Sequence, residues 1–145
     1  MATVSTYLTF AGQTEAAFDF YRRVFGTEYA GPIARFGDIP AGEEMPPLDE
    51  AAKRLVLNVQ LPILGGHLLM GSDCPPGTDA DLSKGNNVSV NLHPDSREAS
   101  DALYAKLSDG GTATMPMADA FWGDYFGALT DRFGIQWMIN HTPSR

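Results

Sequence analysis

The sequence predicts an α+β fold made of two copies of a βαβββ unit, and three observations carry this prediction. The order strand, helix, three strands can be read twice along the 145 residues. Two long loops, rich in proline or glycine, interrupt the predicted strands. Three residues of the first half recur 83 positions later: Glu15, Ala16 and Tyr21 correspond to Glu98, Ala99 and Tyr104. One half alone would be a poorly covered four-stranded sheet, so two halves sharing one domain of 1–145 are expected.

The first half begins with a strand followed by a helix. Residues 4–10 are rich in β-branched and aromatic residues and stop before Gly12, which is typical of a strand. From Thr14 to Phe25 the apolar residues follow a helical period, and Gly26 is suited to end the helix in a left-handed turn. The predicted buried stripe consists of Ala17, Tyr21, Val24 and Phe25.

Three more strands complete the first half, at 28–36, 54–61 and 67–71. The segment 37–53 between the first two holds three prolines and five acidic residues. It is too long and too polar for a tight turn, so we expect a mobile loop or a lid. Module one therefore covers about 1–72, and a loop at 73–87 joins it to module two.

Module two, at about 88–145, repeats the order. Residues 88–92 alternate strictly between apolar and polar side chains, which predicts a half-buried strand. Ser96 is a plausible N-cap for a helix that runs to Ser108, with Ala99, Leu103 and Leu107 as its buried stripe. Strands are expected at 112–117, 125–130 and 135–140, and Asp131 is expected to form the turn between the last two.

Composition narrows the classes of partner and compartment. The net charge of −8 argues against nucleic acid, whose phosphates require a basic face. The single cysteine, Cys74, rules out an intrachain disulfide and fits a reducing compartment. The N-terminal residues predict neither a signal peptide nor a membrane span. We therefore expect a cytoplasmic protein that has no membrane partner.

Sequence motifs at both ends of the chain carry a family resemblance. Near the start stand Tyr-Leu-Thr-Phe-Ala-Gly at 7–12, Glu-Ala at 15–16, Phe-Tyr at 20–21 and Val-Phe-Gly at 24–26. Near the end stand Phe-Trp-Gly-Asp-Tyr-Phe-Gly at 121–127, Thr-Asp-Arg-Phe-Gly at 130–134 and Trp-Met-Ile-Asn at 137–140. With these motifs the chain resembles the PhnB-like branch of the vicinal oxygen chelate superfamily, which includes glyoxalases, bleomycin-resistance proteins and dioxygenases.

The resemblance implies a glyoxalase/bleomycin-resistance fold, in which two modules form a curved mixed sheet around a cleft with the helices on its outer face. Members of this branch are often called demethylubiquinone methyltransferases. The sequence gives that activity no support, because it lacks a glycine-rich strand-to-helix loop of the kind that holds a nucleotide-like cofactor.

Metal-using members of the superfamily hold one divalent ion with His or Glu side chains from four strands. Placed on this sequence from the nearby glycines, the four positions fall at Thr6, Met70, Ser89 and Met138. A shift by one residue gives Tyr7, Leu69, Val90 and Trp137 instead. Neither set suits a stable zinc, nickel or iron site, so we expect no metal and no cofactor.

The same alignment and the strand alternation predict the residues that line the cleft. They are mostly apolar or aromatic, with a few neutral hydrogen-bonding groups, and they suit a neutral or flat ligand better than a multiply charged one. The predicted set is Thr6, Leu8, Phe10, His67, Ser89, Asn91, Trp122, Tyr125, Phe126, Gln136 and Met138.

Three functions remain open at this point. The first is a metal-free protein that binds a small organic molecule in its cleft. The second is a lyase, isomerase or dioxygenase of the same superfamily with a divalent ion at other positions, and the third is a structural dimer with a filled cleft. The vacant metal positions favour the first, and open sheet edges predict a homodimer. No catalytic residue can be assigned.

Overall fold

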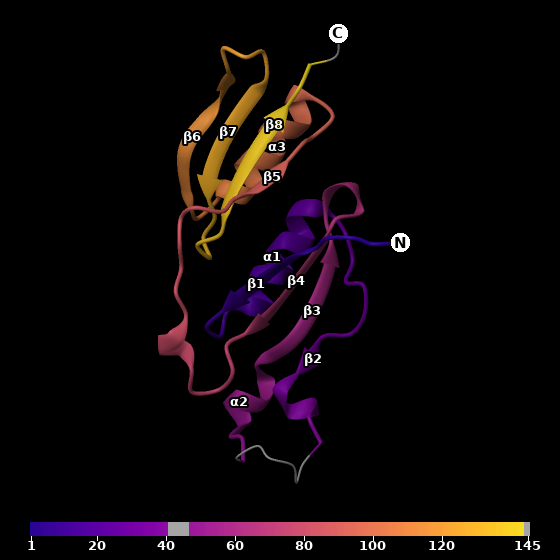
Figure 1. Ribbon diagram of the computed structural model, residues 1–145, viewed down its shortest axis with the longest axis vertical. Coiled ribbons are helices and arrows are strands. Elements are labelled where there is room, and N and C mark those ends of the chain that lie inside the picture. The colour runs from indigo at the N-terminus through magenta and orange to yellow at the C-terminus, as the bar shows by residue number, and fades with distance from the viewer. Residues whose placement is uncertain (41–46, 144–145) are drawn as a thin grey trace. The chain divides into compact units, whose positions relative to one another are not determined.

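The computed structural model describes residues 1–40 and 47–143, and the chain divides into two compact units, Met1–Ser83 and Lys84–Arg145 (Figure 1). Each unit contains one open four-stranded sheet, in the order β1-β4-β3-β2 or β5-β8-β7-β6. In both sheets the first strand of the unit runs parallel to the last strand, and the remaining pairs are antiparallel. The duplicated strand, helix, three-strand order is therefore confirmed.

The helix of unit 1 has the predicted bounds. Strand β1 (Thr6–Phe10) leads into α1 (Thr14–Phe25), and Gly26 ends α1 with a φ of 65° while its N–H donates to the carbonyl oxygen of Arg22. A left-handed backbone costs glycine little, because it has no Cβ. Of the predicted stripe, Ala17 and Tyr21 are buried, whereas Val24 and Phe25 are only partly buried. The other buried residues of α1 are Thr14, Phe18 and Phe20.

The predicted strand at 28–36 is largely wrong. Only β2 (Ala34–Arg35) forms, and it pairs with β3 (Val56–Pro62). Pro32 lacks an N–H and disfavours a ladder position, and in the preceding stretch the N–H of Ala30 donates to the carbonyl oxygen of Gln60. Strand β4 (Leu68–Asp73) follows a short 3₁₀ turn, η2 (Leu64–Gly66).

The segment 37–53, predicted as a loop or lid, contains helical turns. A 3₁₀ turn, η1 (Phe36–Asp38), overlaps its start, and α2 (Glu50–Arg54) overlaps its end. The Asp49 side chain caps α2 by accepting from the N–H of Ala52 at 2.8 Å. Residues 41–46, the middle of this segment, lie outside the described residues. Another 3₁₀ turn, η3 (Asp79–Asp81), lies in the loop after β4.

Unit 2 follows the prediction more closely. Its elements are β5 (Val90–Leu92), α3 (Arg97–Ser108), β6 (Thr112–Asp119), β7 (Tyr125–Thr130) and β8 (Gln136–His141). Ser96 caps α3, since its Oγ accepts from the N–H of Ala99 at 3.0 Å. Ala99 itself is exposed and does not belong to the buried stripe, where Ser100 takes its place beside Leu103 and Leu107.

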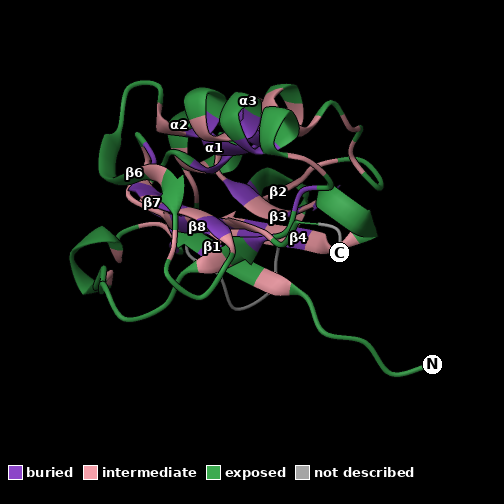
Figure 2. Cartoon of the chain, turned by 90° about the horizontal axis from the view of Figure 1, so that it is seen from above, coloured by how far each residue is buried: buried purple, intermediate pink, exposed green. Residues whose placement is uncertain are grey.

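In each unit the long helix packs on one face of the sheet, and a glycine lets it approach. A Cβ on Gly71 of β4 would lie 2.6 Å from Cε1 of Phe18 in α1, and one on Gly127 of β7 would lie 3.1 Å from Cε2 of Tyr104 in α3. Figure 2 shows the inner faces of these helices buried and their outer faces exposed. The opposite face of each sheet carries none of the long helix of its own unit.

Two buried carboxylates hold turns and strand ends together. Asp73 in β4 and Asp131 after β7 are each 3% exposed. Asp131 accepts from the N–H groups of Phe133 and Ile135 and from Nε1 of Trp137, so the predicted turn former is confirmed.

Among the described residues, the structure has no helix with the length and apolar character that a membrane crossing requires.

Candidate functional site

The sheet face of unit 2 opposite α3 gathers the residues most suited to binding a ligand. Register places Asn91 beside Met138, Met138 beside Ala128, and Phe126 beside Asn140. Neighbours across a ladder point to the same side, and the alternate residues Trp137 and Ile139 are buried on the α3 side. We call the set Asn91, Phe126, Ala128, Met138 and Asn140 the open face of unit 2.

Aromatic rings extend the open face at the β6–β7 turn. Trp122, 55% exposed, lies with its ring centroid 6.0 Å from that of Phe126, at an angle of 61°. Phe121 lies 5.1 Å from Trp122, at 89°. The turn is closed by the N–H of Gly123 donating to the carbonyl oxygen of Ala120, and Gly123 adopts a φ of 103° that favours glycine. The turn thus holds two large apolar rings next to the sheet.

A carboxylate lies at the same end of the open face. Asp124 directly precedes β7, and its Oδ2 accepts from Nδ2 of Asn140, a residue of the open face, at 3.0 Å. Side-chain hydrogen bonds, first from Asn140 and then from Thr142 and Trp122, lower the pKa of Asp124 although burial opposes them. The carboxylate is therefore ionised at neutral pH.

The structure brings together most of the ligand-binding residues predicted in module two. Asn91, Phe126 and Met138 belong to the open face, and Trp122 adjoins it. Gln136 lies two residues before Met138 on the same side of β8, where its amide donates to the carbonyl oxygen of Val88 at 3.1 Å. Ser89 is exposed and precedes β5 rather than lying in it.

Tyr125 is the exception in this module, because it points to the α3 side of the sheet. It is 9% exposed, and its hydroxyl donates to Oδ1 of Asp101 at 2.5 Å. The guanidinium of Arg97 lies 3.8 Å from its ring centroid. The hydrogen bond to Asp101 raises the pKa of Tyr125. Tyr125 therefore holds α3 onto β7, and its predicted place beside Trp122 and Phe126 is corrected.

The predicted ligand-binding residues of module one lie on the covered side of their sheet. Leu8 and Phe10 are 9% and 1% exposed, and they pair with Gly71 and Asp73 on the face that α1 covers. Thr6 alternates with Leu8 and Phe10 and therefore lies on the same face of β1, but it is at the end of the strand and only half-buried. Its Oγ1 lies 2.9 Å from Nε2 of His67. The predicted cleft position of Leu8 and Phe10 is therefore corrected, while that of Thr6 and His67 stays a prediction.

The opposite face of the unit 1 sheet carries Tyr7, Gln60 and Met70, which are neighbours in the ladder. The hydroxyl of Tyr7 donates to Oγ of Ser72 at 2.8 Å. This set was missing from the predicted ligand-binding residues because the alternating side chains of β1 were assigned to the wrong faces of the sheet. The apolar alternation of Leu8 and Phe10 was the signal that could have corrected the choice, since it marks a helix-covered side.

A metal site does not fit the open faces. Of the four positions at which the superfamily resemblance implies ligands, Met70 and Met138 lie on these faces, and their ladder neighbours are Tyr7 and Asn91. Thioether sulfur and neutral amide or phenol groups are a poor donor set for zinc, nickel or iron. Within residues 1–40 and 47–143, no cluster of three or more His, Cys, Asp or Glu side chains has the arrangement of a metal site.

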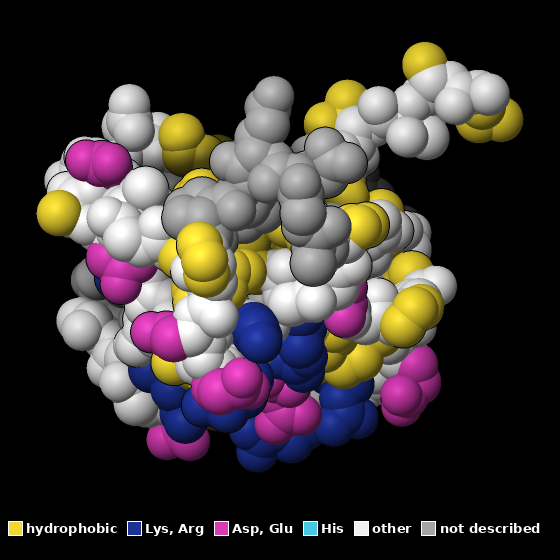
Figure 3. Space-filling view, turned by 90° about the horizontal axis from the view of Figure 1, so that it is seen from below, with side chains coloured by type: hydrophobic (Ala, Val, Ile, Leu, Met, Phe, Trp, Pro, Cys, Tyr) yellow, Lys and Arg dark blue, Asp and Glu magenta, His cyan; other side chains and the backbone are white. Residues whose placement is uncertain are grey.

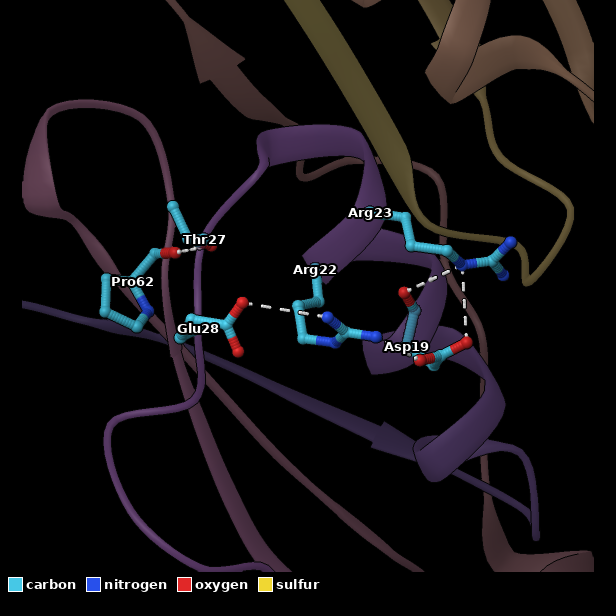
Figure 4. A network of polar contacts seen from close by, with 6 residues as sticks. All are labelled: Asp19, Arg22, Arg23, Thr27, Glu28 and Pro62. Atoms are coloured by element: carbon cyan, nitrogen blue, oxygen red, sulfur yellow. Dashed lines mark hydrogen bonds and ion pairs between the residues drawn. The ribbon is translucent and has the colours of Figure 1, made fainter.

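A second candidate is a groove of about 730 Å³ in unit 1, between α1 and the segment that follows it. It is lined by Gly12, Glu15, Ala16, Asp19, Arg22, Glu28, Tyr29 and Ile33. Figure 4 shows how its charges are paired: Arg22 lies 3.0 Å from Asp19 and 3.8 Å from Glu28.

The Arg35 guanidinium binds Glu15 with two contacts, of 3.0 and 2.8 Å, and this lowers the pKa of Glu15. Basic and acidic side chains are likewise interleaved on the surface seen in Figure 3. Because its charged groups already pair with one another, this groove is a weaker candidate than the open face of unit 2.

Comparison with known proteins agrees with the fold and the motifs. Protein YjdN from Escherichia coli K12 is 28% identical over 144 residues, which cover 94% of this chain and 93% of YjdN. The crystal structure of PA1353 from Pseudomonas aeruginosa has 31% identity and a TM-score of 0.82, with 99% and 100% of the two chains covered. A glyoxalase/bleomycin resistance protein/dioxygenase family enzyme from Burkholderia phytofirmans shares the fold, with 18% identity, 95% and 98% coverage and a TM-score of 0.62.

A protein family described as 3-demethylubiquinone-9 3-methyltransferase matches residues 2–140, which is nearly the whole chain. A structure with that name, a PhnB protein from Bacillus cereus, shares the fold at 22% identity and a TM-score of 0.75, with 97% and 100% of the two chains covered. The chain therefore belongs to this family, and its fold is that of the glyoxalase/bleomycin resistance proteins.

Proposed function

We propose that the protein binds a small organic molecule on the open face of unit 2 and that binding requires no metal ion. The observation that carries the proposal is the gathering of Trp122, Phe126 and Met138 on a sheet face opposite α3. Aromatic and thioether side chains offer a large apolar contact area to a flat ligand. Asn91 and Asn140 supply neutral donors and acceptors at the same face, as in most small-molecule sites.

The donor chemistry of the face favours binding over the metal-dependent alternative. A lyase, isomerase or dioxygenase of this superfamily would need several oxygen or nitrogen ligands where Met138 and Met70 stand. The family name refers to a methyl transfer, but the connection between β1 and α1 has Gly12 as its single glycine and does not resemble a nucleotide-binding loop. Binding is therefore the function that the side chains support best.

The test is a thermal-shift screen of flat organic compounds, combined with metal analysis of protein purified without a tag. A compound that stabilises the protein should lose its effect in Trp122→Leu and Phe126→Ala, because each removes a ring of the contact surface. Leu64→Ala is the matched control, since it removes an exposed apolar side chain in unit 1. Stoichiometric metal, with binding or activity that a chelator abolishes, would contradict the proposal.

We also propose that the protein forms a homodimer. Each sheet is open, so it has two edge strands, and β6 is the longest of them. Seven of its eight residues are exposed, with Met117 intermediate. A long exposed edge has unpaired N–H and C=O groups that can pair with a second chain.

A further inference from the structure

The aromatic rings beside the open face of unit 2 form a corner rather than a flat stack. Phe121 and Trp122 are almost perpendicular at a centroid distance of 5.1 Å, and Trp122 and Phe126 meet at 61° and 6.0 Å. The face of an aromatic ring is electron-rich and attracts a cation that lies within about 6 Å of its centroid. Trp122 and Phe121 are 55% and 98% exposed, so solutes can reach their faces.

A charged acceptor lies directly beside this corner. Asp124 is separated by one residue from Trp122, and its Oδ2 accepts from Nδ2 of Asn140 at 3.0 Å. Side-chain interactions with Asn140, Thr142 and Trp122 hold the pKa of Asp124 below its ordinary value. The bond from Asn140 fixes the carboxylate at the same end of the open face as the indole of Trp122. Because a carboxylate offers about four lone-pair directions, it can still accept a further donor or face a cation.

The nearby basic groups do not neutralise Asp124. Among ion pairs formed by residues 84–143, Arg97 pairs with Asp119 and Arg132 pairs with Asp109, and none includes Asp124. Arg97 also stacks on Tyr125, which points to the α3 side of the sheet. His93 is the group whose positive form acts on Asp124 electrostatically.

We propose that the open face of unit 2 selects singly charged organic cations, with an alkylated ammonium group held between the Asp124 carboxylate and the ring of Trp122. This assignment rests on the proposed function and names its ligand class. An aromatic wall beside one carboxylate is the arrangement by which proteins recognise quaternary ammonium groups. One carboxylate matches one positive charge, while Phe126 and Met138 receive the apolar part of the ligand.

The test compares choline with 3,3-dimethylbutan-1-ol, its uncharged carbon analogue of the same shape, and adds benzyltrimethylammonium as an aromatic cation. Binding to the full-length protein is followed at pH 8 by ¹H–¹⁵N spectra. The chain has two tryptophans, so the indole signal of Trp122 can be read against that of Trp137. Trp137 is 0% exposed and donates to Asp131 at 2.8 Å, which makes it an internal control.

We expect both cations to shift the Trp122 indole and Asn140 amide signals with saturation, and the neutral alcohol to bind at least about fivefold more weakly. Asp124→Asn should weaken cation binding by a similar factor, and Trp122→Leu should abolish it. Glu98→Gln is the charge-matched control, because it removes an exposed carboxylate of α3 and should leave binding unchanged.

Equal affinity for choline and its neutral analogue would overturn the proposed ligand class, as would full cation affinity in Asp124→Asn. If neutral flat compounds bind saturably and cations do not, the ligand class is wrong while the proposed function stands. If neither neutral compounds nor cations shift any signal of the open face, both proposals fail.

Discussion

Asp73 has almost no contact with solvent, yet its carboxylate accepts three hydrogen bonds from two other elements. Oδ1 accepts from the N–H of Thr14 at 3.1 Å and from its Oγ1 at 2.7 Å, and Oδ2 accepts from the N–H of Val56 at 2.8 Å. The side chain thus ties the start of α1 and the start of β3 to the end of β4. Such a group is costly to disturb, because its donors would be left buried without acceptors.

We predict that Asp73→Ala lowers the free energy of unfolding by about 3 kcal/mol, since it leaves the donors of Thr14 and Val56 without their acceptor. Asp73→Asn should cost nearly as much, because one of its two terminal atoms becomes an NH₂ group that faces a donor. Denaturant unfolding measures both, with exposed Asp79→Ala within about 0.5 kcal/mol of wild type as the control. A loss below about 1 kcal/mol in Asp73→Ala would show that these bonds contribute little.

Residue-level prediction from sequence succeeded where local chemistry decides the role. Asp131 was expected in a turn because Asp bonds to nearby backbone N–H groups, and it accepts from two of them. Its third bond, to the indole of Trp137, depends on how β8 returns past the turn. No local pattern shows that contact. The same limit applies to Asp73, whose donors lie 59 and 17 positions away in the sequence.

Gly71 determines how closely α1 can pack on the unit 1 sheet. A Cβ at this position would lie 2.6 Å from Cε1 of Phe18 and 3.0 Å from the carbonyl oxygen of Leu8. The ring could move, but the backbone oxygen of β1 is fixed by its ladder. We predict that Gly71→Ala costs about 1–3 kcal/mol of stability, the usual range for overpacking.

The double variant Gly71→Ala/Phe18→Leu tests this cause of the loss. A smaller side chain at position 18 should recover part of the stability that the alanine removes, giving a positive coupling in a double-mutant cycle. Gly31→Ala is the control, because a Cβ there meets no atom within 4 Å. Equal losses in Gly71→Ala and Gly31→Ala would rule out steric contact with α1 as the reason.

The bounds of a helix or strand were predicted well where the sequence has a clear hydrophobic period and a clear start or stop signal. The bounds of α1 and α3 were right because each has a helical period and a clear stop or cap. The strand at 28–36 failed because β-rich composition alone did not reveal the missing ladder partners around Pro32. The prediction of which residues of β1 face the helix failed for a different reason, since alternation defines two faces but does not say which of them the helix covers.

At the scale of the molecule, the duplication was the most predictable property and the ligand the least. The offset of 83 between matching residues is visible in the sequence, and both units adopt the same strand order. The open face of unit 2 was anticipated through Asn91, Phe126 and Met138, because β5 and β8 both alternate clearly. The hydrogen bond from Asn140 to Asp124 had no signal in the sequence, since the two residues are 16 positions apart.

The proposed homodimer is tested by the mass of the protein in solution. Light scattering across a dilution series at micromolar concentration should give twice the mass of the chain, falling toward the monomer as the sample is diluted. If the exposed edge of β6 mediates association, Thr114→Lys should shift the transition to higher concentration, because a charged side chain disfavours pairing at an edge. Ala51→Lys, which adds the same charge on exposed α2, should leave the transition in place. A monomeric mass throughout the series would refute the dimer, and equal behaviour of the two variants would place the contact away from β6.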